Sequence, residues 1–127
     1  MDKAEYQISS SVNEGILEIV LTGEFRSDSL EKIKNEVVAI EKSVNIKSEL
    51  IDIRKIKGHP SITEIYNFAR NFPYDRPKID TALVDIAENA EIKSFLETTT
   101  LNTGLSFKFF IDIDAARAWL KSVQKKS

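Results

Sequence analysis

Strands and helices alternate along this sequence from about residue 16 to its end, and that alternation constrains the fold more than any other feature. The clearest junction lies at residues 106–120, where an apolar strand runs into the acidic residues Asp112 and Asp114 and then into a helix. The apolar residues of that helix fall on one side. Strands that alternate with helices usually form a mainly parallel sheet covered by helices. The sequence therefore predicts an α/β domain.

The expected elements follow one another in the order ββαβαβαβα. Strands at residues 6–12 and 16–22 are separated only by a turn at residues 13–15, and so short a connection requires an antiparallel hairpin. The further strands are expected at residues 50–53, 79–86 and 106–111, and the helices at residues 28–44, 61–72, 89–102 and from about residue 112 onward. This order predicts a single mixed, mostly parallel sheet covered by about four helices.

The composition fits one soluble globular domain that spans residues 1–127. The chain is 42% hydrophobic and 30% charged, and its net charge of −2 with a pI near 5.5 gives no basic surface of the kind that nucleic acid requires. The absence of cysteine excludes disulfides, thiolate metal sites and a cysteine nucleophile. No apolar run approaches the ~20 residues that span a bilayer, and the N-terminus lacks the apolar core of a signal peptide. We therefore expect a cytoplasmic protein without a membrane-spanning segment.

A basic loop is expected at residues 54–60, between the third expected strand and the next helix. In open α/β sheets, ligands usually bind beyond the carboxyl ends of the strands, where this segment lies. The cations Arg54, Lys55 and Lys57 would attract a carboxylate, a phosphate or an acidic partner surface there. The alternative is that these cations only keep a loop in water. His59 is the one histidine and has no carboxylate at a metal-binding spacing, so we expect neither a metal site nor a catalytic base there.

Aromatic residues and arginines gather just downstream, at residues 66–76. Phe68 falls on the flank of the expected helix rather than on its buried side, and Arg70 follows it two positions later. Protein interfaces favour aromatic residues together with arginine. Phe68 and Arg70 are therefore candidate contact residues, with core packing as the alternative reading.

Several carboxylates lie in or beside the expected strands. The expected strands contain three aspartates, Asp52, Asp80 and Asp85. We expect their side chains to meet near one edge of the sheet. Acid–base chemistry by paired carboxylates would need a pocket, and the sequence indicates none. We expect Asp112 and Asp114 to cap the last helix, whose amino end favours negative charge.

Three segments of the chain match motifs of one known family. The stretch from Gly15 to Glu24 ends in a Leu-x-Gly step after a strand, and the stretch from Glu49 to Arg54 is a strand with an acidic residue near its carboxyl end. The stretch from Phe110 to Leu120 reads Phe-x-Asp-x-x-x-Ala-x-x-Trp-Leu. All three resemble the SpoIIAA-like group of STAS domains, and the likeness covers almost the whole chain.

The resemblance implies a four- or five-stranded sheet with packed helices and no catalysis. STAS domains typically bind a partner protein, and in the anti-sigma-factor antagonists a serine at the start of the second helix is phosphorylated to control that binding. Ser61 lies at about that place, although the family's Asp-Ser-Ser-Gly is replaced here by Pro60-Ser61-Ile62-Thr63. Ser61 with Glu64 also forms the pattern of a capping box, which is the structural alternative to phosphorylation.

We therefore predict a non-enzymatic, STAS-like binding or regulatory module with a protein partner and with no cofactor, metal or catalytic residue. The residues expected to carry the binding surface are Arg54, Lys57, His59, Ser61, Phe68 and Arg70, with Ser61 as the candidate phosphorylation site. One alternative follows from the relation of the SpoIIAA-like group to lipid-binding SEC14-type folds. It is a carrier or sensor of a small apolar or lipid-like ligand, held between the sheet and the helix at residues 61–72. A second alternative is an enzyme that uses His59 with an acidic partner, and pairing into a homodimer is also left open.

Overall fold

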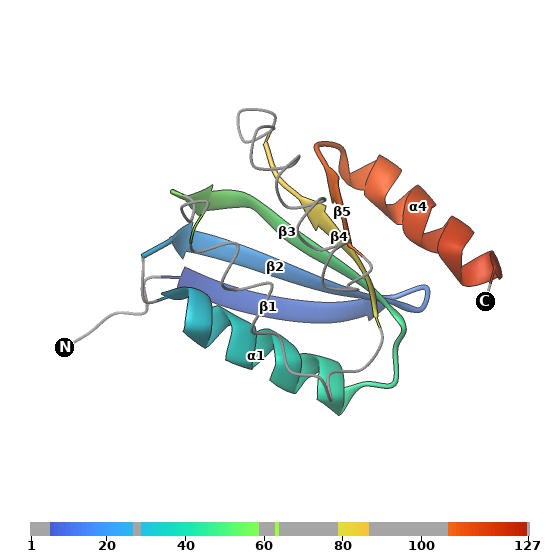
Figure 1. Cartoon of the computed structure of the whole chain (residues 1–127), viewed down its shortest axis with the longest axis horizontal. Coiled ribbons are helices and arrows are strands. Elements are labelled where there is room, and N and C mark those ends of the chain that lie inside the picture. The colour runs from blue at the N-terminus through green and yellow to red at the C-terminus, as the bar shows by residue number, and fades with distance from the viewer. Residues whose placement is uncertain (1–5, 27–28, 59–62, 64–78, 87–106, 127) are drawn as a thin grey trace.

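The computed structural model of the chain describes residues 6–26, 29–58, 63, 79–86 and 107–126. Its described elements are β1 (Tyr6–Asn13), β2 (Ile16–Glu24), α1 (Ser29–Ser43), β3 (Ser48–Lys57), β4 (Asp80–Val84), β5 (Phe107–Phe110) and α4 (Ile113–Lys126). Figure 1 shows the strands side by side in a single sheet, in the order β1-β2-β3-β4-β5.

The sheet is mixed and mostly parallel, as the sequence predicts. β1 and β2 pair antiparallel, whereas the pairs β2–β3, β3–β4 and β4–β5 are parallel. α1 joins the parallel pair β2 and β3, and α4 follows β5. The helices expected at residues 61–72 and 89–102 lie outside the described residues, so the figure of about four helices stays a prediction.

The hairpin between β1 and β2 turns within two residues. Glu14 and Gly15 both have positive φ, 54° and 79°. A two-residue turn of type I′ needs positive φ at both central positions, and its twist matches that of the flanking strands. Glycine adopts this conformation at little cost, which explains why Gly15 signals the turn in the sequence.

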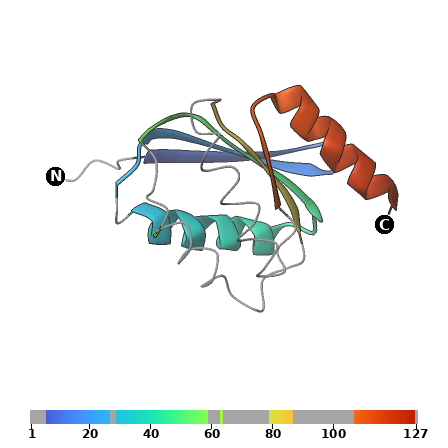
Figure 2. The same ribbon diagram turned by 45° about the horizontal axis from the view of Figure 1, so that its top comes forward.

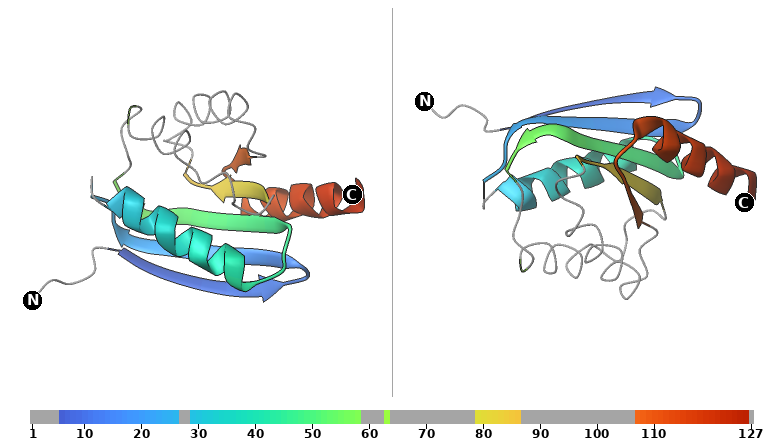
Figure 3. Two further views of the ribbon diagram at one scale, coloured as in Figure 1. Left: turned by 60° about the horizontal axis from the view of Figure 1, so that its bottom comes forward. Right: turned by 90° about the horizontal axis from the view of Figure 1, so that it is seen from above.

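The two described helices lie on opposite faces of the sheet (Figures 2 and 3). Successive side chains of a strand point to opposite faces, so β2 contributes to both cores. On one face lies the α1-side cluster, which consists of Tyr6, Leu17, Ile19, Leu21, Ile33 and Val37. On the other lies the α4-side cluster, which consists of Ile16, Leu50, Ala82, Val84, Ala116 and Leu120.

β3 is longer than the sequence analysis predicts. The expected strand ends at residue 53, but β3 runs on to Lys57, so the prediction of a loop from residue 54 is wrong for residues 54–57. These residues continue to pair with β2, since Thr22 lies opposite Lys55 and Glu24 lies opposite Lys57. A bulge between Val20 and Thr22 permits this, because it gives β3 one more residue than β2 at that place.

Asp112 begins α4 as a cap. Its Oδ1 accepts a hydrogen bond from the backbone amide of Asp114 at 3.1 Å, and its carbonyl accepts one from the amide of Ala116 at 3.1 Å. The first bond satisfies an amide that a helix terminus otherwise leaves without a partner, and the second is the first intrahelical bond of α4, which the carbonyl of the capping residue accepts. The expectation that this helix is capped is confirmed for Asp112 and wrong for Asp114, which lies in the first turn of α4, where its negative charge favours the amino end.

We expect Asp112→Ala to lower the free energy of unfolding by about 1 kcal/mol, because it removes the capping oxygen. Asp112→Asn is the matched control, since asparagine keeps a side-chain oxygen at the same distance from the backbone and is a good cap. Urea unfolding followed by circular dichroism measures both variants. Equal losses in the two variants would show that the capping oxygen contributes nothing.

Candidate functional site

The candidate binding surface lies at the carboxyl edge of the sheet, where β3 ends. Of the six residues predicted to form it, Arg54 and Lys57 are described. His59, Ser61, Phe68 and Arg70 lie outside the described residues, so capping and phosphorylation of Ser61 both stay predictions.

The bulge decides which side chains of β3 point to which face. Ile51, Ile53 and Ile56 all pack against the α1-side cluster, although the step from Ile53 to Ile56 breaks the two-residue repeat of a regular strand. The extra residue of β3 at the bulge accounts for this three-residue step. As a result Lys55 and Lys57 lie opposite Thr22 and Glu24 on the α4 side of the sheet.

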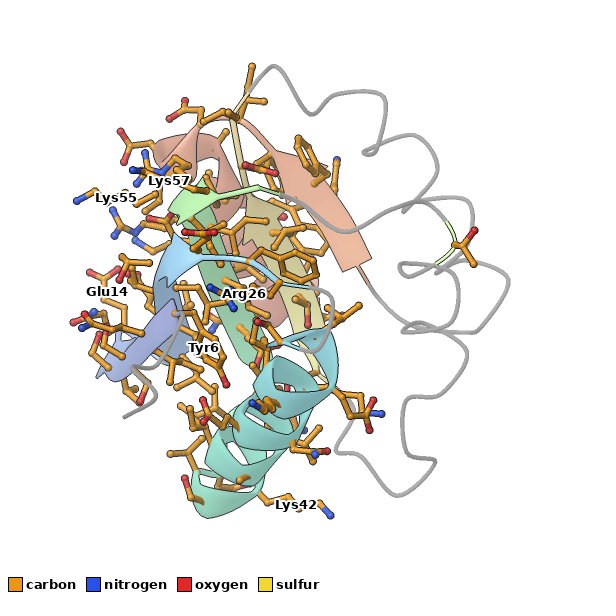
Figure 4. All side chains as sticks on the ribbon, turned by 90° about the vertical axis from the view of Figure 1, so that its left-hand side faces the viewer. Tyr6, Glu14, Arg26, Lys42, Lys55 and Lys57 are labelled. Carbon is orange, nitrogen blue, oxygen red and sulfur yellow. The ribbon has the colours of Figure 1, made fainter. Side chains whose placement is uncertain are left out.

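Lys55 and Lys57 are exposed, and Figure 4 shows both at the end of β3, away from α1. Within the described ranges, neither lysine side chain forms a hydrogen bond or an ion pair, although the backbone carbonyl of Lys57 accepts a hydrogen bond from the amide of Phe25 at 2.8 Å. Glu24, which faces Lys57 across the strand pair, is exposed as well. This end of β3 therefore offers two solvated cations on one side of the sheet.

Arg54 has a different environment, because it pairs with the nearly buried Asp52. Its Nε donates to Asp52 Oδ1 at 3.0 Å, its Nη2 donates to Oδ2 at 2.8 Å, and its backbone amide donates to Oδ1 at 3.1 Å. Two parallel bonds of this kind are the strongest geometry for an arginine and a carboxylate. The charge of Arg54 is therefore largely compensated within the protein.

The pair also sets the ionisation of Asp52. Burial alone would raise the pKa of this carboxyl group, but the hydrogen bonds from Arg54 and the charges of Arg54 and Lys55 outweigh burial and hold the pKa below its usual value. The hydrogen bonds to Asp52 likewise raise the pKa of Arg54, and Asp112 at the start of α4 adds to this. Asp52 thus stays charged over the whole neutral range.

A second arginine–carboxylate pair joins α4 to β2. Arg117 donates from Nε to Glu18 Oε2 and from Nη2 to Glu18 Oε1, both at 3.0 Å. The side chain of Glu18 is 12% exposed, and the pair raises the pKa of Arg117. The sequence analysis missed this contact, since 99 residues separate its partners and no local pattern links them.

α4 also holds the β1–β2 turn. Gln124 donates from Nε2 to the carbonyl oxygen of Gly15 at 3.2 Å, and Lys121 Nζ lies 2.5 Å from Glu14 Oε2. Together with the Glu18–Arg117 pair, these contacts fix one side of α4 along β2.

Apolar side chains are exposed at the same edge of the sheet, beyond β4 and β5. Ile86 is 40% exposed and Ile111 is 59% exposed. The ends of β4 and β5 that lead to these two isoleucines lie side by side, because the amide of Asp85 donates to the carbonyl of Phe110 at 3.0 Å. We use the term carboxyl-edge surface for Lys55, Lys57, Ile86 and Ile111.

The predicted meeting of three aspartates is wrong. Asp52 lies opposite Val84 near the carboxyl end of β4, with Asp85 next along the chain, but Asp80 lies opposite Ser48 at the other end of both strands. The parallel register of β3 and β4 imposes this separation, since Asp80 begins a strand whose end carries Asp85.

Within the described ranges, no three histidine, cysteine, aspartate or glutamate residues lie together as potential metal ligands. Neither α1 nor α4 combines the length and the apolar character that a membrane-spanning helix needs.

Solved structures share this architecture. A crystal structure of an anti-sigma factor antagonist from Mycobacterium paratuberculosis superimposes with a TM-score of 0.54 and 14% sequence identity, covering 91% of this chain and 94% of that one. An uncharacterized protein of the DUF3478 family from Shewanella loihica, described as having a SpoIIAA-like fold, superimposes with a TM-score of 0.58 and 16% identity, covering 94% and 98%. The chain has a SpoIIAA-like fold.

This SpoIIAA-like fold confirms the resemblance that the sequence motifs indicate. No model of a protein family and no curated protein matches the sequence. The likeness is therefore one of backbone arrangement at low sequence identity.

We expect Arg54→Met to lower the free energy of unfolding by about 2 kcal/mol at pH 7, because it leaves Asp52 charged without its two guanidinium donors. The pKa of Asp52 is lower in the folded than in the unfolded chain, so the pair stabilises above the unfolded value of about 4 and loses its effect as the pH falls. The difference between wild type and variant should therefore narrow below about pH 4.

Urea unfolding at pH 7 and at low pH measures this difference. Lys57→Met is the control, since it removes a positive charge at an exposed position of the same strand that does not contribute to the pKa shift of Asp52. A stability difference for Arg54→Met that does not change with pH would contradict the role given to the ion pair.

Proposed function

We propose that this domain is a non-enzymatic regulatory module that binds a partner protein through its carboxyl-edge surface. The observation that carries the proposal is the exposure of two lysines, Lys55 and Lys57, and of apolar Ile86 and Ile111 at one edge of the sheet, the edge where α/β sheets usually bind their ligands. The similarity in fold to an anti-sigma factor antagonist supports a role in protein binding.

The charges of the site suggest the chemistry of the partner. Arg54 and Arg117 are each taken up by a carboxylate, whereas Lys55 and Lys57 are solvated. Solvated lysines break no ion pair within the protein when they bind an acidic group, and they attract such a group over about a Debye length. The partner would then offer acidic side chains to the lysines and an apolar contact to the isoleucines.

Phosphorylation of Ser61 would regulate this binding. Ser61 follows the end of β3 at Lys57 by four residues. A phosphate group there would bring nearly two negative charges close in sequence to the two lysines and would compete with an acidic partner. Mass spectrometry of protein isolated from its own cells tests this, and a Ser61 found without phosphate under all growth conditions would remove the switch.

The alternative of a lipid-like ligand concerns the space between the sheet and the helix expected at residues 61–72, which lies outside the described residues. Native mass spectrometry of freshly purified protein distinguishes a carrier of a lipid-like ligand from a module that binds only a partner protein. A ligand that co-purifies supports the carrier, and a protein that always has its bare mass argues against it.

The charge reversals Lys55→Glu and Lys57→Glu, made together, should weaken partner binding by about tenfold or more, because they replace attraction by repulsion. Chemical crosslinking in the cells that make the protein, followed by affinity purification and quantitative mass spectrometry, measures how much partner is retained.

The control is the double variant Lys32→Glu and Lys47→Glu, which makes the same charge change at two exposed lysines elsewhere. Circular dichroism checks that both variants fold. Equal retention of the partner by the two double variants would reject the carboxyl-edge surface as the binding site.

A further inference from the structure

Among the described elements, β1 is a long edge strand without the usual protection of such strands. It stands at one end of the strand order, and in the left view of Figure 3 no described element lies beyond it. Its eight residues include no charged residue and no proline, and they pair with β2 without a bulge. Natural edge strands usually carry at least one of these features, because an unprotected edge pairs readily with another strand.

The turn determines which backbone groups of β1 face outward. Asn13 and Ile16 flank the two-residue turn, so they form a hydrogen-bonded pair. Such pairs alternate along an antiparallel ladder. The odd-numbered residues of β1 therefore bond to β2, and Ile8, Ser10 and Val12 direct their amides and carbonyls to the open edge.

The side chains of β1 match those of a second β1 in the antiparallel direction. When the two-fold axis passes through Ser10, Ile8 lies opposite the partner's Val12, and Ser9 lies opposite the partner's Ser11. Gln7 then lies opposite the partner's Asn13. Apolar thus meets apolar, hydroxyl meets hydroxyl and amide meets amide, and pairs of this kind stabilise sheets.

The exposure of Val12 also favours a second copy of β1 as the strand that pairs with this edge. Its side chain is 49% exposed on the same face as Ile8, which packs against the α1-side cluster. In the paired arrangement the partner's Ile8 would cover it. A second copy therefore adds apolar side chains to this face on both sides of the central pair of Ser10 residues.

We propose that two copies of this chain pair through β1, antiparallel and centred on Ser10, and thereby join their two five-stranded sheets into one. This pairing is independent of the partner-binding function and leaves the carboxyl-edge surface of each copy open. The contact is small beside the ~1,600 Å² of a standard interface, so the dimer should dissociate on dilution.

Cysteine crosslinking tests the pairing sharply, since the chain has no cysteine of its own. In Ser10→Cys the two thiols would meet at the axis, where opposite Cα atoms lie about 5.5 Å apart, within the span of a disulfide. Ser122→Cys is the matched control at an exposed position of α4, and Ser9→Cys tests the register.

We expect wild-type protein to sediment as a mixture that shifts from monomer to dimer with concentration. Under mild oxidation, Ser10→Cys should form the linked dimer at least about tenfold faster than Ser122→Cys, because pairing raises the local thiol concentration. Ser10→Lys should fold, by circular dichroism, and remain monomeric.

Monomeric wild-type protein at all concentrations would overturn the proposal, as would crosslinking of Ser10→Cys no faster than that of Ser122→Cys. Faster linking of Ser9→Cys than of Ser10→Cys would overturn the register.

Discussion

The pairing of β2 with β3 is the constraint on which the rest of the structure depends. β2 is the strand at which the antiparallel hairpin joins the parallel part of the sheet. It also contributes to both cores, since Ile16 belongs to the α4-side cluster while Leu17 and Ile19 belong to the α1-side cluster. Each helix therefore packs onto side chains that this strand pair holds in place.

The charges of the α4 side divide into two groups with different roles. Asp52 with Arg54 and Glu18 with Arg117 form closed pairs, in which each nearly buried carboxylate receives two bonds from one guanidinium group. The value of such pairs lies in position more than in stability, because desolvation offsets much of the attraction. They fix β3 and α4, and the lysines beyond them are left for contact with other molecules.

Much of the fold could be predicted from local pattern. The five strands, the first and last helices, the glycine turn and the cap at Asp112 each depend on neighbours in the chain, and the structure bears them out. The length of β3 could not be predicted, because an isoleucine three positions after Ile53 does not fit a regular strand until the bulge is known. The Glu18–Arg117 pair could not be predicted either, because the two side chains come into contact only when α4 packs against the sheet.

The bulge has a consequence for how the length of this chain can vary. The face of each residue from 55 to 57 follows from its partner on β2, so the residue that β3 has in excess is not needed to keep Ile56 inside or the lysines outside. A shorter relative lacking that one residue would have a regular strand with the same inner and outer faces. A one-residue deletion in this sheet is therefore best tolerated at residues 53–55, where it exchanges a bulge for a straight ladder.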